Sequence, residues 1–429
     1  MNAATHAGDT AWLLCASALV LLMAPGLALF YGGMVRSKSV LNMMMMVFGA
    51  LAVSALAWVL VGYSVAFGDD LGLGLVGDPT QYLGFDGLLG NAMVGNVPAP
   101  LFAMFQGLFG VITVALVAGA IADRTKFGSW LVFAAVWTVI VYAPVAHWIF
   151  DFDSDGHQGG WMANQLGALD FAGGTAVEIN SGAAGLAVAL VLGPRLGFGR
   201  EAMKPHNLTL VMLGAGLLWF GWFGFNAGSA LGANATAAVV FVNTLMAGCT
   251  GLLAWLVVER FRDGHATSFG GASGVVAGLV AITPSCGAVT PIGAMVVGAV
   301  AGTVCALAVG LKSRFGYDDS LDVVGVHLVG GVVGMLLIGL LASGTAPQAV
   351  DGLLYGGGAD QLLKQAVAVA ATLVYSFVVT TVLALVIQKT IGFRIDPEHE
   401  TTGVDLVVHG ETAYDLHVAT SGARPHLGG

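Results

Sequence analysis

The chain has 429 residues, of which 57% are hydrophobic and only 9% are charged. Because soluble domains carry about 25% charged residues, this composition excludes water as the main solvent and predicts a membrane protein. The formal net charge of −10 resides in acidic loops and the C-terminal tail, and no basic patch indicates a nucleic-acid partner.

Eleven segments of the chain contain the roughly 20 apolar residues that a membrane-spanning helix needs. In chain order they cover residues 10–33, 41–67, 100–122, 128–150, 169–193, 208–231, 234–258, 268–286, 289–311, 321–342 and 363–388. The N-terminus lacks the positive stretch of a cleaved signal peptide, so we expect the first segment to be retained. The prediction is an all-α polytopic membrane protein, with a transmembrane domain over residues 1–389 and a cytoplasmic C-terminal tail over 390–429.

The basic residues determine the expected orientation. With the N-terminus outside, every lysine and arginine except Lys364 falls in an inner loop or in an inner tail, which is the usual bias of cytoplasmic loops. The aspartate-containing loops 68–99 and 151–168 then lie outside, where they either attract cations or simply keep the loops soluble. Spans one to five and six to ten run in opposite directions, as in an inverted 5+5 repeat followed by a final helix. We expect a multi-pass protein of the cell membrane (inner or plasma membrane), N-out and C-in.

The fifth and tenth segments carry ionisable side chains at equivalent places in the two halves. Asp170 and Glu178 belong to the fifth segment, and Asp322 and His327 belong to the tenth. Such groups are costly in hydrocarbon, so they usually face a cavity or a partner and mark a pathway for ions or protons. The alternatives are helix caps for the two aspartates and hydrogen-bonded core positions for Glu178 and His327.

Aromatic side chains supply a second indication. Phe105 and Phe109 lie four residues apart in the third segment and therefore share a helical face, and Ser229 follows Phe225 by one turn in the sixth. Ring faces attract compact cations, and a hydroxyl accepts a hydrogen bond from an N–H donor. The alternative for these aromatics is ordinary packing between membrane helices.

The four cysteines lie in or beside apolar segments without paired spacing, so neither a disulfide, a metal site nor a cofactor is predicted. No Ser/His or metal-ligand constellation indicates an enzyme.

Five stretches stand out by their order along the chain: Pro25–Gly33, Asp170–Gly174, Gly221–Ser229, Gly325–His327 and His409–Tyr414. Together they resemble the ammonium transporter family (Amt/Mep/Rh), and the resemblance runs from about residue 12 to about residue 415. It implies homotrimers in a lipid bilayer with one pore per subunit, and ammonium, ammonia and methylammonium as substrates. For bacterial members it also implies a cytoplasmic regulator, a small trimeric nitrogen-signalling protein of the PII class.

The resemblance further assigns roles to residues. The implied vestibule and gate residues are Phe105, Phe109, Phe225 and Ser229, with Trp222 in the same stretch. Of these, Phe109, Phe225 and Ser229 match the cation cage, and Phe105 and Phe225 match a gate over Phe109. Asp170 matches an essential aspartate below the vestibule, and His327 matches the second of two pore histidines. The resemblance leaves Asp322 as a structural or proton-relay candidate.

The chain departs from the family pattern at two places. Glu178 replaces the first pore histidine, a variant that also occurs in some fungal members. The vestibule tryptophan is displaced, so that either Trp148 or Phe150 completes the cation site.

The expected function is ammonium transport. Ammonium would be recruited at the aromatic vestibule, lose its proton, and cross as ammonia through an apolar pore lined by Glu178 and His327, with or without a separate proton relay. The alternatives are an ammonium sensor acting through a partner protein and a neutral channel for ammonia or carbon dioxide.

Overall fold

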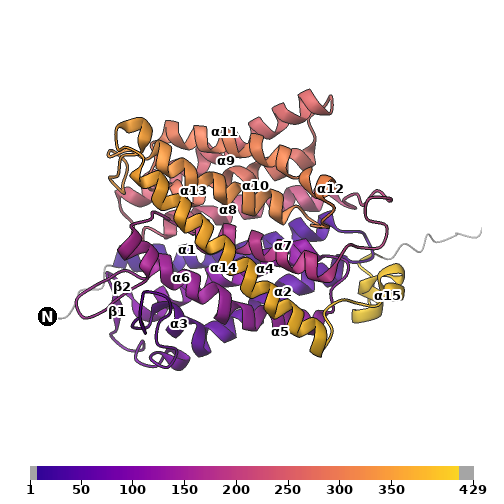
Figure 1. Ribbon diagram of the computed structural model, residues 1–429, viewed down its shortest axis with the longest axis horizontal. Coiled ribbons are helices and arrows are strands. Elements are labelled where there is room, and N and C mark those ends of the chain that lie inside the picture. Colours follow the sequence, from indigo (N-terminus) through magenta and orange to yellow (C-terminus); the bar gives the residue numbers. More distant parts are fainter. Residues whose placement is uncertain (1–6, 415–429) are drawn as a thin grey trace, which may run out of the picture.

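The computed structural model describes residues 7–414, and this part of the chain is mostly helical (Figure 1). Eleven of its helices are long and apolar enough to cross a membrane. They cover Ala7–Met34, Val40–Phe67, Ala99–Ile121, Phe127–Phe150, Gly174–Leu192, Leu208–Gly228, Ala235–Arg262, Ser268–Ser285, Pro291–Phe315, Val324–Leu341 and Asp360–Thr390. The predicted number of spans and their places in the chain are therefore confirmed. The fifth span begins later than predicted, at Gly174, because residues 170–173 are not helical.

The α-helices are α1 (Ala7–Met34), α2 (Val40–Ala57), α3 (Tyr63–Phe67), α4 (Ala99–Val117), α5 (Phe127–Trp137), α6 (Ala143–Phe150), α7 (Asn180–Leu192), α8 (Leu208–Gly228), α9 (Ala235–Arg262), α10 (Ser268–Ser285), α11 (Pro291–Ala308), α12 (Leu311–Phe315), α13 (Val329–Leu341), α14 (Asp360–Thr390) and α15 (Pro397–Thr402). The π-helical turns are η1 (Trp58–Gly62), η4 (Thr138–Tyr142), η5 (Met162–Leu166), η6 (Gly174–Ile179), η7 (Val324–Leu328) and η9 (Asp405–His409). The 3-10 turns are η2 (Leu83–Phe85), η3 (Ala118–Ile121) and η8 (Leu353–Tyr355). Strands β1 (Met93–Val94) and β2 (Val97–Pro98) form a short antiparallel hairpin.

The long helices lie side by side in one bundle, and the connecting segments gather at its two ends (Figure 1). The β1–β2 hairpin and α3 lie at the end where α1 begins, which we call the hairpin end. Helices α12 and α15 lie at the opposite end, which we call the tail end. Helix α14 crosses the bundle diagonally from one end to the other (Figure 1).

Residues 390–414 pack on the tail end. The carboxylate of Asp405 accepts hydrogen bonds from the backbone N–H groups of Leu41 and Asn42 at 3.0 and 2.7 Å. These donors belong to the first turn of α2, where helical N–H groups lack partners within the helix. The tail therefore caps a membrane helix. The rest of the predicted tail, residues 415–429, lies outside the described residues.

The fifth and tenth spans both begin with a π-helical turn. Glu178 lies in η6, and His327 lies in η7. A π-helical turn widens the helix locally and is frequent at functional sites. The residue before η6 is Gly173, whose φ of +127° is accessible only without a side chain.

Glycine also allows the closest approach between these two spans. A Cβ at Gly331 would lie 2.8 Å from the Cβ of Glu178, and one at Gly182 would lie 2.4 Å from the backbone nitrogen of Leu328. Each glycine therefore permits a backbone contact that any other residue would prevent. This contact brings Glu178 and His327 to the same depth in the bundle.

Candidate functional site

The two ionisable side chains that the sequence singled out are hydrogen bonded to each other. Nδ1 of His327 lies 2.7 Å from Oε2 of Glu178. Only 4% of His327 and 1% of Glu178 is exposed. The imidazole and the carboxyl therefore form one buried unit that can hold or exchange a proton.

This pair faces a narrow cavity inside the bundle. The other lining residues are all apolar or aromatic: Met23, Leu27, Phe30, Ile112, Leu116, Val177, Leu218, Trp222, Phe225 and Val276. The indole N–H of Trp222 donates to Oγ1 of Thr283 at 2.8 Å, so it does not solvate the cavity. Among the side chains that line this cavity, only those of Glu178 and His327 therefore offer hydrogen-bonding groups to a small neutral molecule.

A wide cavity of about 730 Å³ opens at the hairpin end. Residues of the hairpin, Met93–Gly95, form part of its wall, together with Phe109, Phe150, Asp170 and Ser229. The hydroxyl of Ser229 donates to the carbonyl of Phe225 at 2.8 Å, which leaves its oxygen lone pairs free to accept a hydrogen bond.

Two stacked phenyl rings separate the wide and narrow cavities. The rings of Phe109 and Phe225 lie 4.1 Å apart at an interplanar angle of 24°. Phe109 lines the wide cavity, whereas Phe225 lines the narrow one. Phe105 lines neither and packs edge-on against Phe109 at 5.0 Å. The barrier between the cavities is therefore the Phe109–Phe225 stack, with Phe105 behind it.

The structure distinguishes the two candidates for the displaced vestibule tryptophan. Phe150 lines the wide cavity, and Trp148 does not. The indole N–H of Trp148 donates to the carbonyl of Leu75 at 2.8 Å, and its ring lies 4.7 Å from that of Tyr375. Trp148 thus packs behind the wall, while Phe150 presents a phenyl group to the cavity.

Asp170 caps the π-helical turn that carries Glu178. Its Oδ1 accepts from the N–H groups of Gly173 and Gly174, and its Oδ2 accepts from the N–H of Thr175, all at 2.7 Å. The hydroxyl of Thr175 also donates to Oδ2. Asp170 also lines the wide cavity. Asp170 is therefore a helix cap that also lies at the wall of the wide cavity.

A third cavity continues from His327 toward the tail end. Its lining includes Tyr31, Ser273, Asp322 and His327. Asp322 Oδ1 lies 2.7 Å from Nζ of Lys312 in α12, which lies at the tail end. The three cavities thus follow one another from the hairpin end to the tail end, interrupted by the phenyl stack and by the Glu178–His327 pair.

Comparison with known proteins shows to which family the chain belongs. The sequence profile described as Ammonium Transporter Family matches residues 11–414. The chain belongs to the ammonium transporter family. A relative from Mycobacterium bovis named ammonium transporter is 56% identical, over 97% of this chain and 92% of the relative.

Solved structures of related proteins share the fold. Mep2 from Saccharomyces cerevisiae matches with a TM-score of 0.83 and 37% identity, over 91% of this chain and 88% of that one. A protein described as a sensor Amt protein matches with a TM-score of 0.87 and 29% identity, over 95% of this chain and 99% of that one. The family is one of transporters rather than enzymes.

The structure rules out one of the alternatives that the sequence left open for Asp322, namely that it caps its helix. As a cap, Asp322 would have been the tenth-span counterpart of Asp170. Instead, Asp319 caps η7, because its two oxygens accept from Val323 and Val324 at 3.1 and 2.7 Å. Burial raises the pKa of Asp319 to about 6. The missed signal is spacing: Asp170 precedes Glu178 by eight residues, and Asp319 precedes His327 by eight.

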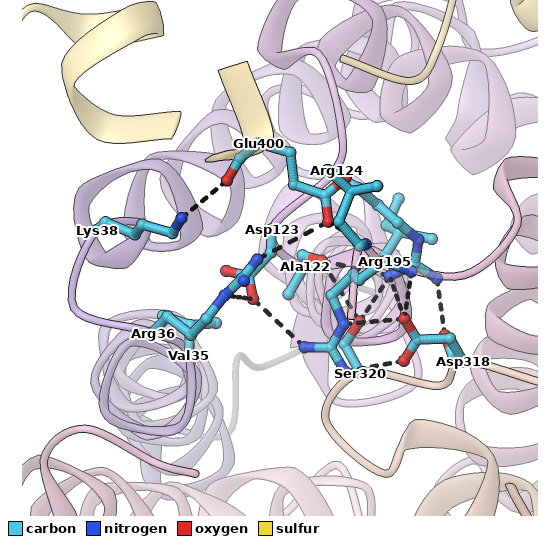
Figure 2. A network of polar contacts seen from close by, with 12 residues as sticks. Val35, Arg36, Lys38, Ala122, Asp123, Arg124, Arg195, Asp318, Ser320 and Glu400 are labelled. Carbon is cyan, nitrogen blue, oxygen red and sulfur yellow. Dashed lines mark hydrogen bonds and ion pairs between the residues drawn. The ribbon is translucent and has the colours of Figure 1, made fainter. Parts of the chain in front are cut away.

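The ammonium transporter also holds an ion-pair network at its tail end, which the sequence did not indicate (Figure 2). Arg195 is bound through its side chain and its backbone N–H to the carboxylate of Asp318, at 2.7–2.9 Å. It also contacts Asp123 at 3.3 Å, and Asp123 in turn pairs with Arg36 at 3.1 Å. Glu400 in α15 accepts from the N–H of Leu196 at 2.7 Å, which connects the tail to the loop carrying Arg195.

At the hairpin end, His157 joins the two acidic loops. Its Nδ1 lies 2.7 Å from Asp69, and its Nε2 lies 2.9 Å from Asp151. Burial lowers the pKa of His157, but hydrogen bonds and charge from the two aspartates outweigh it, so that the pKa is raised overall. The loop contact is therefore strongest while His157 is protonated.

We expect this loop contact to weaken in alkaline solution. A raised folded-state pKa stabilises the contact fully below the unfolded value of about 6.5, and this contribution is lost as the pH rises through the folded value. Hydrogen exchange of residues 151–160 should quicken as the pH rises above about 6.5, by more than the ordinary acceleration of exchange with pH. In His157→Asn this extra pH dependence should be absent, and its persistence there would show that another group is responsible.

Proposed function

We propose that this protein imports ammonium, and that it conducts the nitrogen as ammonia past the Glu178–His327 pair. The observation that carries the proposal is this single hydrogen-bonded pair in an otherwise apolar cavity, directly behind a phenyl stack. An ammonium ion entering that cavity would exchange its hydration shell for hydrocarbon, which is very costly for a charge. Ammonia carries no charge and still finds hydrogen-bonding partners at Glu178 and His327.

The wide cavity supplies the recruitment step. Ring faces of Phe109 and Phe150 attract the cation, the Ser229 oxygen accepts one of its N–H bonds, and the Asp170 charge favours the ionised form. Ammonium loses its proton as it crosses the phenyl stack, and the Glu178–His327 unit behind the stack accepts that proton. The released proton passes through the hydrogen-bonded Glu178–His327 unit toward Asp322, so that each turnover moves net charge.

Orientation and assembly follow the same reasoning. The hairpin end, with its acidic loops, faces outward, and the arginine-rich tail end faces the cytoplasm, in line with the distribution of basic residues. We propose a homotrimer in the cell membrane with one pathway in each subunit, and methylammonium as a second substrate. The cytoplasmic face around α15 is where a regulator of the PII class would dock.

The sensor function is the second candidate, because one structural neighbour is described as a sensor Amt protein. Purified protein in lipid vesicles separates the two functions. A transporter carries ammonium without any other protein, whereas a sensor binds ammonium and gives little or no flux. We expect saturable flux that requires this protein alone.

Glu178→His is expected to change the pH dependence and the rate of transport without abolishing it. Two imidazoles, each with a reference pKa near 6.5, hold a proton differently from an imidazole and a carboxyl group with a reference pKa of about 4.3. Methylammonium uptake across a pH series, in cells lacking their own carriers, measures the change. Glu178→Leu is the matched control, because it removes the hydrogen bond and should lower the rate further. An unchanged pH profile in Glu178→His would exclude Glu178 from proton handling.

A further inference from the structure

The segment that handles substrate, Asp170–Ile179, is held at both of its ends by α14. At its start, the amide of Gln365 forms two hydrogen bonds with the backbone of Leu169. It accepts from the N–H of Leu169 at 2.8 Å and donates to the carbonyl of Leu169 at 2.7 Å. At the other end, the hydroxyl of Ser376 donates to the carbonyl of Asn180 at 2.8 Å.

These contacts are buried, and a further hydrogen bond from Gln361 reinforces the one made by Gln365. Gln365 and Ser376 are both 0% exposed. Gln361 donates to Oε1 of Gln365 at 3.0 Å and to the carbonyl of Gly167 at 3.3 Å, which fixes the orientation of the Gln365 amide. Inside a low-dielectric interior such hydrogen bonds are strong, and an unmade one leaves a buried polar group without a partner.

The contacts have the same spacing along the two segments that they join. Leu169 and Asn180 are eleven residues apart, and so are Gln365 and Ser376. The intervening segment is irregular: residues 170–173 are unwound, and η6 is π-helical. A regular helix fixes its own length, whereas an unwound segment does not. Helix α14 is continuous from Asp360 to Thr390, so it can hold the two ends of the irregular segment at a fixed distance from each other.

We propose that Gln365 and Ser376 are positioning residues that set the distance between the Asp170 carboxylate and the Glu178–His327 pair. This inference rests on the proposed function, since it assigns the two groups successive steps of one transport cycle. Neither Gln365 nor Ser376 lines the wide or the narrow cavity, so both act through the backbone that they hold. A misplacement of about 1 Å between groups that act in sequence can cost up to about a hundredfold in rate.

The test compares Gln365→Leu, Ser376→Ala and Ser376→Thr with Thr372→Val. Thr372 lies on the same face of α14, one turn before Ser376, and is equally buried. Its hydroxyl has no hydrogen-bond partner among the described residues, so its removal controls for a change in this helix. We expect Gln365→Leu to lower the maximal ammonium current per folded transporter roughly tenfold and Ser376→Ala roughly threefold. Both should shift the pH profile, Ser376→Thr should restore it, and Thr372→Val should match the unsubstituted protein.

A purely structural role would lower the yield of folded protein but leave the current per folded transporter and the pH profile unchanged. That result for Ser376→Ala, which removes only a hydroxyl, would overturn the proposal even if Gln365→Leu fails to fold. Hydrogen exchange of residues 168–180 provides a readout independent of transport, and it should quicken in both variants but not in Thr372→Val. If the unsubstituted protein carries no ammonium current, the proposed function fails, and this exchange measurement still decides whether the positioning contacts exist.

Discussion

Asp170→Ala is expected to abolish ammonium transport. The carboxylate accepts three backbone N–H groups and the Thr175 hydroxyl, and it forms part of the floor of the wide cavity. Alanine removes the cap of the turn that carries Glu178 and also the negative charge that favours ammonium at the phenyl stack. Methylammonium uptake in cells lacking their own carriers should fall to background, with the variant protein present in the membrane.

A conservative variant separates the cap from the charge. Asp170→Asn keeps a side-chain oxygen for the cap but carries no charge, so it should fold better than Asp170→Ala and still transport poorly. Asp86→Ala is the control, because Asp86 lies exposed in the loop at the hairpin end, and within residues 7–414 its carboxylate accepts a hydrogen bond only from the N–H of Gly87. Full activity of the Asp170→Ala protein would count heavily against the proposed function.

Asp318→Ala is expected to cause the largest loss of stability. Removing one partner of a buried ion pair typically costs about 3–5 kcal/mol, because the other charge remains buried and unpaired. Here the carboxylate is fully buried, and it pairs with Arg195 at 2.8 Å and lies 3.8 Å from Arg124. Thermal unfolding in detergent should show a clear fall in the midpoint temperature.

The pH dependence of this contact has a defined sign. Burial raises the pKa of Asp318, but hydrogen bonds and charge from Arg195 outweigh it, so that the pKa lies below its usual value. A depressed carboxyl pKa contributes stability above the unfolded value of about 4, and this stability is lost as the pH falls through the folded value. Asp263→Ala, which breaks the half-exposed Arg262–Asp263 pair, should change the midpoint little. Equal midpoints for the two variants would contradict the account of the network.

The sequence predicted the spans well because length and apolar composition alone determine whether a helix can cross a bilayer. It also identified Glu178 and His327, since ionisable side chains in such segments are rare. That these two meet at 2.7 Å depends on the glycine contacts between the fifth and tenth spans, which no single segment reveals.

Other features of the site depend on tertiary contacts between distant parts of the chain. Trp148 and Phe150 are two residues apart, and only their helix orientation and the Leu75 carbonyl decide which one lines the cavity. Asp319 and Asp322 are three residues apart, and only the start of η7 decides which one is the cap. The π-helical turns were not predicted either, because length and apolar composition identify a span without distinguishing α-helical from π-helical turns.

The most direct test of the central claim is the current evoked by ammonium in vesicles that contain only this protein, measured across a pH series and compared with potassium. We expect a saturable ammonium current whose size depends on pH, with no current from potassium, because an intact cation does not pass the apolar cavity beside Glu178 and His327. A potassium current of similar size, or ammonia flux without any current, would contradict this expectation.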